Sequence, residues 1–188
     1  MKKLLITLLA GMAVSAYADN ATVPAAADTL SPVYINLNTG FATFANLPTG
    51  SWAGALNVGY NFNQALAIEV GYNLLPSSQF GTTTVTENVF DVAVKGTLPL
   101  TEMFSLYGRL GVGIGNNNWS GTAPTTGNCV LCTSGLSSTY GVGLAGIGAS
   151  FKLSQHFDLR VEDYALVPFQ NTYTGTANVV TGGVQYNF

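Results

Sequence analysis

Apolar and polar residues alternate with a period of two along most of this chain. From Val33 to Thr43, apolar side chains occupy most odd positions, while even positions include Asn36, Asn38, Gly40 and Ala42. A period of two predicts β-strands, because successive side chains of a strand point to opposite faces. The sequence therefore predicts an all-β chain of eight strands, near residues 33–43, 56–62, 66–74, 90–95, 104–114, 138–153, 157–163 and 180–188.

Two of these segments depart from simple alternation. Between residues 138 and 153 the apolar residues move from even to odd positions, with Gly143, Gly146 and Gly148 around the change. Such a phase shift is typical of a β-bulge, so we predict one there. In the seventh segment Asp163 falls on the apolar face unless the strand ends at that point.

The composition of the two faces indicates what surrounds these strands. A soluble sandwich carries Lys, Glu and Thr on its outer face, whereas here one face is apolar and the other is small, polar or charged. We therefore expect the apolar face to contact lipid, where every backbone polar group needs a partner and the sheet must close on itself. Segments of about 10 to 13 residues suit tilted strands that cross a bilayer. The sequence predicts an eight-stranded antiparallel up-and-down transmembrane β-barrel over residues 32–188.

The connections alternate in length, as such a barrel requires. Short turns at 61–65, 98–103 and 154–156 alternate with longer segments at 76–84, 116–137 and 168–176, and 46–50 forms a modest loop. Short turns face the periplasm in outer-membrane barrels, so both chain ends are predicted there. Aromatic girdles are expected near the short turns (Tyr60, Phe62, Phe104, Phe151, Phe157, Tyr186, Phe188) and near the loops (Phe41, Trp52, Tyr72, Tyr140).

The composition narrows the function classes. Only 8% of the residues are charged, against about 25% in ordinary soluble domains. A net charge of −3 argues against a nucleic-acid partner, because such proteins neutralise phosphates with basic residues. A mean hydropathy of +0.31 argues against disorder.

The first residues indicate export. Residues 1–18 combine Lys2 and Lys3, an apolar run and small residues at Ala16 and Ala18, which predicts a secretory signal peptide. Residues 19–31 are interpreted as a flexible periplasmic lead-in.

The chain has two cysteines, Cys129 and Cys132, and export favours a small loop disulfide between them. Free thiols are the main alternative. A catalytic redox pair needs a helix N-terminus and a zinc site needs four ligands, so the sequence gives little support to either.

Seven charged side chains fall on the inward face by parity. They are Glu69, Asp91, Lys95, Arg109, Asp158, Arg160 and Glu162. Eight strands leave a lumen barely wide enough for side chains, and unpaired ions there are costly. We therefore predict a lumen plugged by ion pairs, with a gated pore or a proton path as the alternative.

Two other patterns suggest chemistry that the sequence does not support. The segment GVGLAG at 141–146 fits a dinucleotide fingerprint, but the sequence after it continues as strand, turn and strand instead of a helix. His156 is the only histidine and falls in a predicted short turn, where a solvated role is the simplest interpretation. We predict no catalytic centre, no metal site and no cofactor, and hence no enzyme.

Several segments carry a resemblance to a known family. The stretches AIEVGYNLLP, FDVAVKGTLPLTEMFSLYGRLGVGIG, RVEDY and the terminal VQYNF resemble the transmembrane domain of the OmpA family, over nearly all of residues 31–188. The resemblance implies an eight-stranded outer-membrane barrel. It also implies a lumen ion-pair cluster at Glu69, Lys95 and Arg160, although Ser150 stands where a second acid is expected. Tyr186 and Phe188 resemble the C-terminal signal that the barrel-assembly machinery reads.

The last predicted strand ends the chain, so the resemblance is to compact members and opacity-like surface barrels without a peptidoglycan-binding domain. We expect a non-enzymatic protein with a structural membrane role, in contact with lipid and lipopolysaccharide. One alternative is an adhesin that binds a host or surface ligand through the loop at 116–138, where Trp119 is an aromatic candidate. The other is a narrow solute pore.

Overall fold

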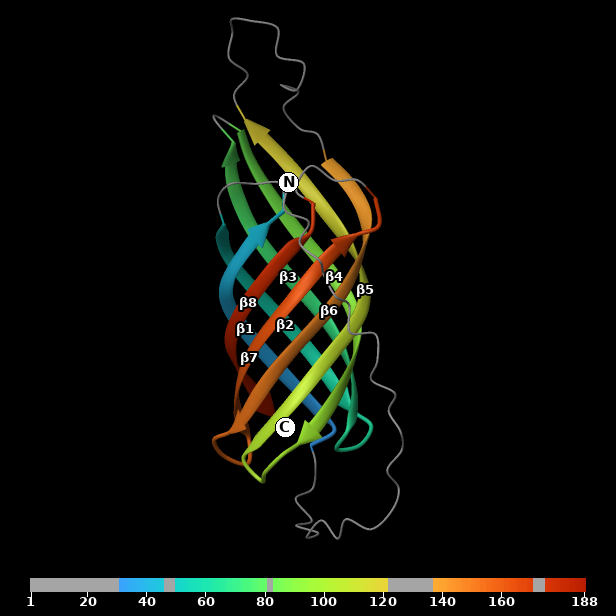
Figure 1. Cartoon of the computed structure of the whole chain (residues 1–188), viewed down its shortest axis with the longest axis vertical. Coiled ribbons are helices and arrows are strands. Elements are labelled where there is room, and N and C mark those ends of the chain that lie inside the picture. The colour runs from blue at the N-terminus through green and yellow to red at the C-terminus, as the bar shows by residue number, and fades with distance from the viewer. Residues whose placement is uncertain (1–30, 46–49, 81–82, 122–136, 171–174) are drawn as a thin grey trace, which may run out of the picture.

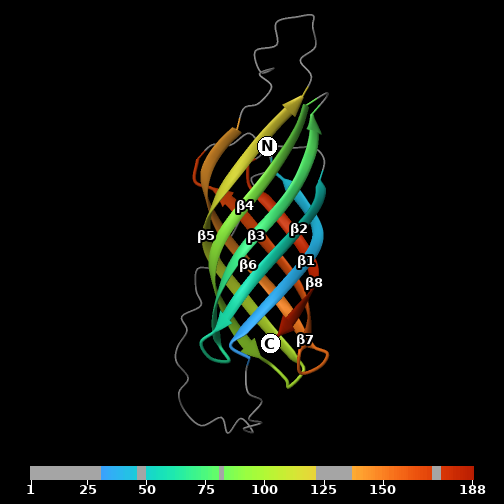
Figure 2. The ribbon, with the colours of Figure 1, turned by 180° about the vertical axis from the view of Figure 1, so that it is seen from behind.

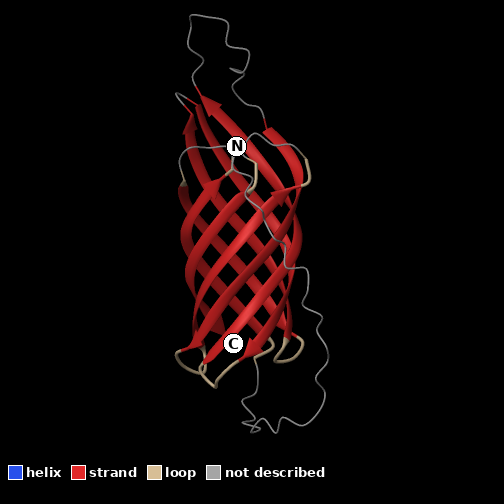
Figure 3. Cartoon of the chain, in the orientation of Figure 1, coloured by secondary structure: helices blue, strands red, loops and turns tan. Residues whose placement is uncertain are grey.

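The computed structural model describes residues 31–45, 50–80, 83–121, 137–170 and 175–188. These ranges form eight strands, and Figure 3 shows the described chain as strands and short loops. The strands are β1 (Val33–Phe44), β2 (Ser51–Asn61), β3 (Leu66–Phe80), β4 (Thr83–Pro99), β5 (Phe104–Gly121), β6 (Ser137–Lys152), β7 (Phe157–Pro168) and β8 (Ala177–Asn187). In the part of the chain so described, no helix is long and apolar enough to cross a membrane.

Every strand pairs antiparallel with its neighbours in the sequence, and β1 pairs with β8 to close the sheet. Figures 1 and 2 show the resulting barrel of tilted strands from two opposite sides. Closure gives each strand two hydrogen-bonded neighbours, so the sheet has no open edge. The predicted fold class is confirmed.

The outer wall of the barrel is apolar. Along β1 the odd positions are exposed and the even positions are largely buried, so Ile35 and Leu37 face outward while Asn36 and Asn38 face the lumen. The same alternation places Leu110 and Ile147, each 70% exposed, on the outside. A continuous apolar wall of this size is unfavourable in water and suits hydrocarbon. The predicted outward orientation of the apolar face is confirmed for these strands.

The two ends of the barrel differ. At one end, here called the short-turn end, lie three tight connections together with Val33 and Asn187; the opposite end is the loop end. β4 and β5 are the longest strands, and together with β3 they extend past the other strands at the loop end (Figure 1). The loop predicted to begin at 116 therefore begins later, because β5 continues to Gly121, with Trp119 paired to Val85.

Polar side chains shape the three tight turns. The Asn63 side-chain oxygen accepts hydrogen bonds of 2.8 Å from the backbone N–H groups of Ala65 and Leu66. The hydroxyls of Thr101 and Ser154 accept equivalent bonds at the other two turns. These short side chains mimic a backbone turn, which explains their position between strands.

The bulge predicted in the sixth strand is absent from β6. Its pairing with β5 and with β7 runs without a shift through Gly143, Gly146 and Gly148. The apolar residues change parity because Val142 and Leu144 point into the lumen, whereas Ile147 points outward. An irregularity that the sequence did not reveal lies instead between Leu75 and Ser78, where β3 shifts against β4.

The lumen has an apolar layer toward the loop end. Its members pack as one buried cluster that includes Phe44, Leu75, Val89, Val142, Leu144, Leu166 and Val179. Tyr140 belongs to this cluster and is 4% exposed, so its predicted place in an outer aromatic girdle is wrong. The inward face is thus apolar at one depth and charged at another.

Asp163 remains on the apolar face. β7 does not end near it but continues to Pro168, so this carboxyl group lies on the outer wall. Its neighbours across the sheet are Ile147 of β6 and Val180 of β8.

If the outer wall contacts lipid, a charge there is more costly at mid-depth than near the rim. We expect Leu110→Arg to lower the free energy of unfolding by about 2–4 kcal/mol. The matched variant Leu98→Arg, near the short-turn end and 61% exposed, should lower it by about 0–1 kcal/mol. Equilibrium urea unfolding in lipid vesicles measures both values. Equal losses at the two positions would contradict the assigned depth.

Candidate functional site

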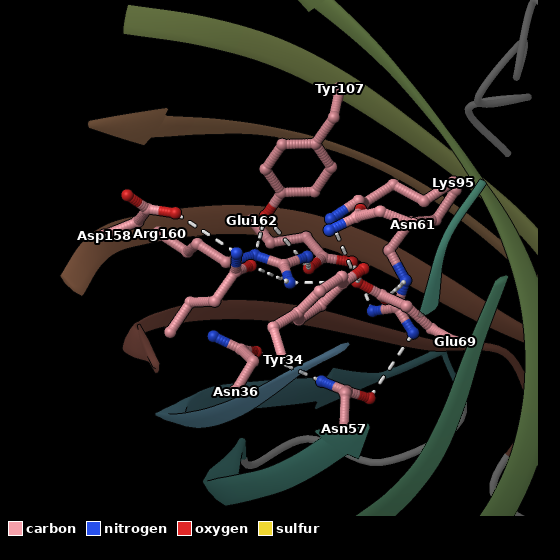
Figure 4. A network of polar contacts seen from close by, with 12 residues as sticks. Tyr34, Asn36, Asn57, Asn61, Glu69, Lys95, Tyr107, Asp158, Arg160 and Glu162 are labelled. Atoms are coloured by element: carbon pink, nitrogen blue, oxygen red, sulfur yellow. Dashed lines mark hydrogen bonds and ion pairs between the residues drawn. The ribbon is translucent and has the colours of Figure 1, made fainter. Parts of the chain in front are cut away.

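The lumen on the short-turn side of the apolar layer holds three buried acids and three buried bases. The acids are Glu69, Asp91 and Glu162, and the bases are Lys95, Arg109 and Arg160. They project from β3, β4, β5 and β7, and Figure 4 shows most of them converging on the barrel interior. We call these six residues the lumen charge cluster. Their formal charges cancel, as burial in a narrow lumen requires.

Glu69 is the centre of the lumen charge cluster. Its Oε1 lies 3.0 Å from Nη1 of Arg160 and 3.4 Å from Nζ of Lys95. Its Oε2 lies 2.7 Å from Nε of Arg109. The Tyr34 hydroxyl donates a 2.6 Å hydrogen bond to Oε1. A single carboxylate from β3 therefore contacts bases from three other strands, including β7 on the far side of the barrel.

Glu162 completes a ring of ion pairs. Its Oε1 lies 2.7 Å from Nη1 of Arg109, and its Oε2 lies 3.3 Å from Nη2 of Arg160. Each arginine therefore bridges Glu69 and Glu162, and the four side chains form a closed cycle across the lumen. Glu162 is thus the second acid that both arginines contact.

Two tyrosines support the bases from the side. The Lys95 ammonium lies 4.1 Å from the centre of the Tyr34 ring, and the Arg160 guanidinium lies 4.5 Å from the centre of the Tyr107 ring. Both distances suit cation–π attraction. The Tyr107 hydroxyl also accepts a 3.1 Å bond from Nε of Arg160 and donates a 3.1 Å bond to Glu162.

Glycines make room for these rings. A Cβ atom at Gly59 would collide with the Tyr34 ring, and one at Gly148 would collide with the Tyr107 ring. The absence of a side chain on the inward face of β2 and β6 thus allows an aromatic ring to lie against the neighbouring strand. Of the three glycines that suggested a bulge in β6, Gly148 has this packing role.

Asp91 links the charged region to the apolar layer. Its Oδ1 lies 3.6 Å from Nη2 of Arg109, and its Oδ2 accepts a 2.6 Å bond from the Asn73 amide. Asn73 in turn accepts a 2.8 Å bond from the hydroxyl of Tyr164, a member of the apolar cluster. The polar contacts therefore continue up to the apolar layer.

Asp158 lies apart from the ring. It is half-buried near the short-turn end, and its Oδ2 accepts bonds of 3.1 Å from Gln185 and 2.9 Å from Asn187. Of the seven predicted inward charges, the structure brings six together in the lumen charge cluster and places Asp158 beside it.

The sequence reasoning missed one buried acid. Glu87 of β4 is 4% exposed and receives a hydrogen bond from the Tyr140 hydroxyl near the loop end. It has the same parity as Asp91 on the same strand, which is the signal that identifies it. It was overlooked because β4 was predicted to begin near Phe90, seven residues after its first residue, Thr83.

The other predicted site residues fall elsewhere. Tyr186 and Phe188 lie on the outer wall at the short-turn end, with ring centres 5.1 Å apart, and Phe157 packs 5.2 Å from Tyr186. Cys129 and Cys132 lie outside the described residues, as does the side chain of Trp119. Residues 1–30, which include the predicted signal peptide, are also outside them.

The chemistry available to the lumen charge cluster is limited by its own contacts. Its acids and bases are paired with one another across the lumen. Among the described residues, no group of three or more His, Cys, Asp or Glu side chains is placed to hold a metal ion.

Comparisons with known proteins agree with this architecture. Residues 4–188 match the family profile described as outer membrane protein beta-barrel domain. A search of curated protein sequences gave no match.

Three solved barrels illustrate the structural similarity, which concerns the fold. Neisserial surface protein A is 13% identical, with a TM-score of 0.69, and the alignment covers 84% of this chain and 98% of that one. Ail of Yersinia pestis is 15% identical, with a TM-score of 0.54 and coverages of 83% and 96%. The N-terminal β-barrel domain of Pseudomonas aeruginosa OprF is 10% identical, with a TM-score of 0.54 and coverages of 82% and 97%.

Removal of the central carboxylate tests how strongly the lumen charge cluster stabilises the barrel. Glu69→Ala leaves three buried bases without their common partner, and we expect the free energy of unfolding to fall by about 3–5 kcal/mol. Glu102→Ala, which removes the same side chain from an exposed turn, should change it by less than about 0.5 kcal/mol. Urea titration of both variants in vesicles measures the difference. A loss below 1 kcal/mol for Glu69→Ala would show that the bases find other partners.

Proposed function

Because the chain belongs to the outer membrane protein beta-barrel domain family, we propose that it is a closed, non-enzymatic barrel with a structural role in the bacterial outer membrane. In this proposal the short-turn end and both chain ends face the periplasm, and the loop end faces the cell surface. The alternation of short turns and longer loops supports this orientation.

The observation that carries the proposal is the ion-pair ring that crosses the lumen. Glu69 of β3 and Arg160 of β7 come from opposite sides of the barrel, yet their side chains meet at 3.0 Å. Side chains therefore occupy the axis along which a solute would travel. The apolar layer, with Leu144, Leu166 and Val179, blocks the same axis nearer the loop end.

Two barriers of different chemistry make permeation costly. An ion that passes the ring must separate charges that are buried and mutually paired, and it must then lose its hydration shell in the apolar layer. A neutral solute meets the same steric block, because an eight-stranded lumen is only wide enough for side chains. These considerations favour a closed barrel over a narrow pore.

The pairing of the charges also argues against catalysis in the lumen. A general base must be free to accept a proton from a substrate or from water. Glu69 and Glu162 each contact two arginines instead, and both are buried. A structural role for this cluster follows from the same contacts.

The proposed partners of the outer surface are the membrane and the assembly machinery. The apolar wall, with Leu37, Leu56 and Val112 exposed, would contact lipid and the acyl chains of lipopolysaccharide. The exposed aromatic rings of Tyr186 and Phe188 at the end of β8 are available to the barrel-assembly machinery.

Electrical recording tests closure. Purified barrel inserted in a planar bilayer should show no stable open level, and vesicles that contain it should not swell in small sugars, because the ring and the apolar layer both occupy the axis. An SDS gel with and without boiling provides the folding control, since a folded barrel migrates differently when unboiled. Steady ohmic conductance from gel-verified folded protein would contradict the proposal.

A second candidate function is ligand binding at the loop end, supported by the extension of β3, β4 and β5 beyond the other strands. One Ail structure contains the heparin analogue sucrose octasulfate, a polyanion. In this chain the sequence stretches at the loop end, 45–50, 76–88, 115–141 and 169–178, contain no Lys, Arg or His. A ligand of this surface would therefore be recognised by neutral side chains.

We accordingly expect sucrose octasulfate not to bind this barrel, because polyanion binding depends on basic side chains. The double variant Asn118→Lys and Thr139→Lys, which adds two exposed cations to β5 and β6, should gain binding that weakens as salt increases. Calorimetric titration of wild type and variant at two salt concentrations measures both. Salt-dependent binding by the wild type would refute the expectation.

A further inference from the structure

Asp163 lies deep in the lipid-facing wall. It is halfway along β7 between Phe157 and Phe169, six residues from each, and both rings are exposed on the outer surface. With a rise of about 3.3 Å per residue and a tilt of about 40°, the carboxyl group lies about 15 Å along the barrel axis from each aromatic position. Because the apolar band of such barrels is about 25 Å tall, Asp163 falls near its middle.

This carboxyl group has no partner within the described part of the barrel. The residues that face it from the adjacent strands are Ile147 of β6 and Val180 of β8, and its outward neighbours on β7 are Val161 and Ala165. The aspartate side chain is too short to reach the membrane surface from this depth. A polar group in hydrocarbon without a hydrogen-bonding partner is costly, and such residues typically mark a functional contact.

Among the described residues, no base of the barrel reaches this position. Lys95, Arg109 and Arg160 are buried in the lumen, and Lys152 also has inward parity on β6. The described outer wall around Asp163 carries no other charged side chain. A partner for this carboxyl group would therefore lie outside the described barrel.

The wall beside Asp163 allows close approach. Its nearest outward neighbours toward the loop end are small, with Ala145 on β6 and Ala165 on β7, and larger side chains return only at Val167 and Phe169, whereas the wall of β3 and β4 carries Tyr72 and Phe90. β6, β7 and β8 lie side by side in Figure 1. Small residues at membrane interfaces let two protein surfaces come together and strengthen polar contacts between them.

We propose that Asp163 marks a contact surface for a second copy of this chain. Two copies inserted in the same direction hold Asp163 at the same depth, so a twofold axis along the membrane normal, just outside β7, brings the two carboxyl groups together. One protonated carboxyl group then donates an O–H···O⁻ hydrogen bond to the other, which is among the strongest bonds two identical side chains can form. A basic partner protein would need a lipid-facing cation at the same depth, whereas a second copy meets the requirement by itself.

Cysteine cross-linking in outer membranes tests this contact. In a Cys129→Ser, Cys132→Ser background, Ala165→Cys places a thiol two residues from Asp163, and Val92→Cys places one on the opposite part of the wall, between Val70 and Val112. Oxidation should give a band of twice the monomer mass for Ala165→Cys and not for Val92→Cys. Adding Asp163→Leu should reduce the dimer band at least tenfold, while Asp163→Asn, which keeps a hydrogen-bonding group, should retain part of it.

Folding and partner identity are controlled in the same gels. Leucine suits a lipid-facing position, so the Asp163→Leu barrel should keep its heat-dependent migration. Equal dimer bands at both cysteine positions, or a dimer that survives Asp163→Leu in folded protein, would overturn the proposal. A cross-linked band of any other mass that depends on Asp163 would overturn it too, because it would assign the surface to a different protein.

Discussion

The requirement that every backbone N–H and C=O group be paired in hydrocarbon determines this structure. Hydrogen bonds between β1 and β8 close the sheet, and once it is closed each residue has a fixed direction, either toward lipid or toward the lumen. A shift of one strand by one residue would exchange the two sets of side chains, so the register is as strongly determined as the closure. In β7, for example, such a shift would move Arg160 and Glu162 into lipid and Leu159 and Val161 into the lumen.

The narrowness of the lumen explains why its buried acids and bases lie against one another. Water has little room among the inward side chains, so each buried charge must find an opposite charge or a hydrogen-bonding group on another strand. Glu69 meets this requirement through Lys95, Arg109 and Arg160, and the tyrosines do so through carboxylates and amides. Where no charges are present, apolar side chains such as Leu144 and Leu166 fill the space instead. The polar ring and the apolar layer are two solutions to the same packing problem.

Much of the barrel could be predicted from the sequence because the alternation of apolar and polar residues shows which side chains of a strand share a face. It identified eight strands and the inward direction of Glu69 and Arg160, which lie 91 residues apart. It failed where hydrophobicity is ambiguous: Val142, Leu144 and Tyr140 are apolar or aromatic in a chain whose lipid face and inner layer both accept such residues. The predicted bulge in β6 arose from that ambiguity. The start of β4 and the end of β5 were misplaced. Strand pairing continues there through mostly polar residues, which show no alternation of apolar and polar positions.

Asp163 is an exception to the alternation of apolar and polar residues, because its carboxyl group lies on the apolar outer face. The contacts of the other charged residues on β7 explain why the strand keeps this register. Correcting its position by a register shift would bring one carboxyl group into the lumen, but it would expel Arg160 and Glu162, which together make three of the four ion pairs in the ring. The lumen charge cluster therefore holds β7 in place and fixes Asp163 on the outside. A substitution to an apolar residue would remove the conflict without disturbing the lumen, so its presence is not explained by packing within one barrel. The remaining explanation is a contact outside it, and the small side chains of Ala145 and Ala165 leave space for one at that place.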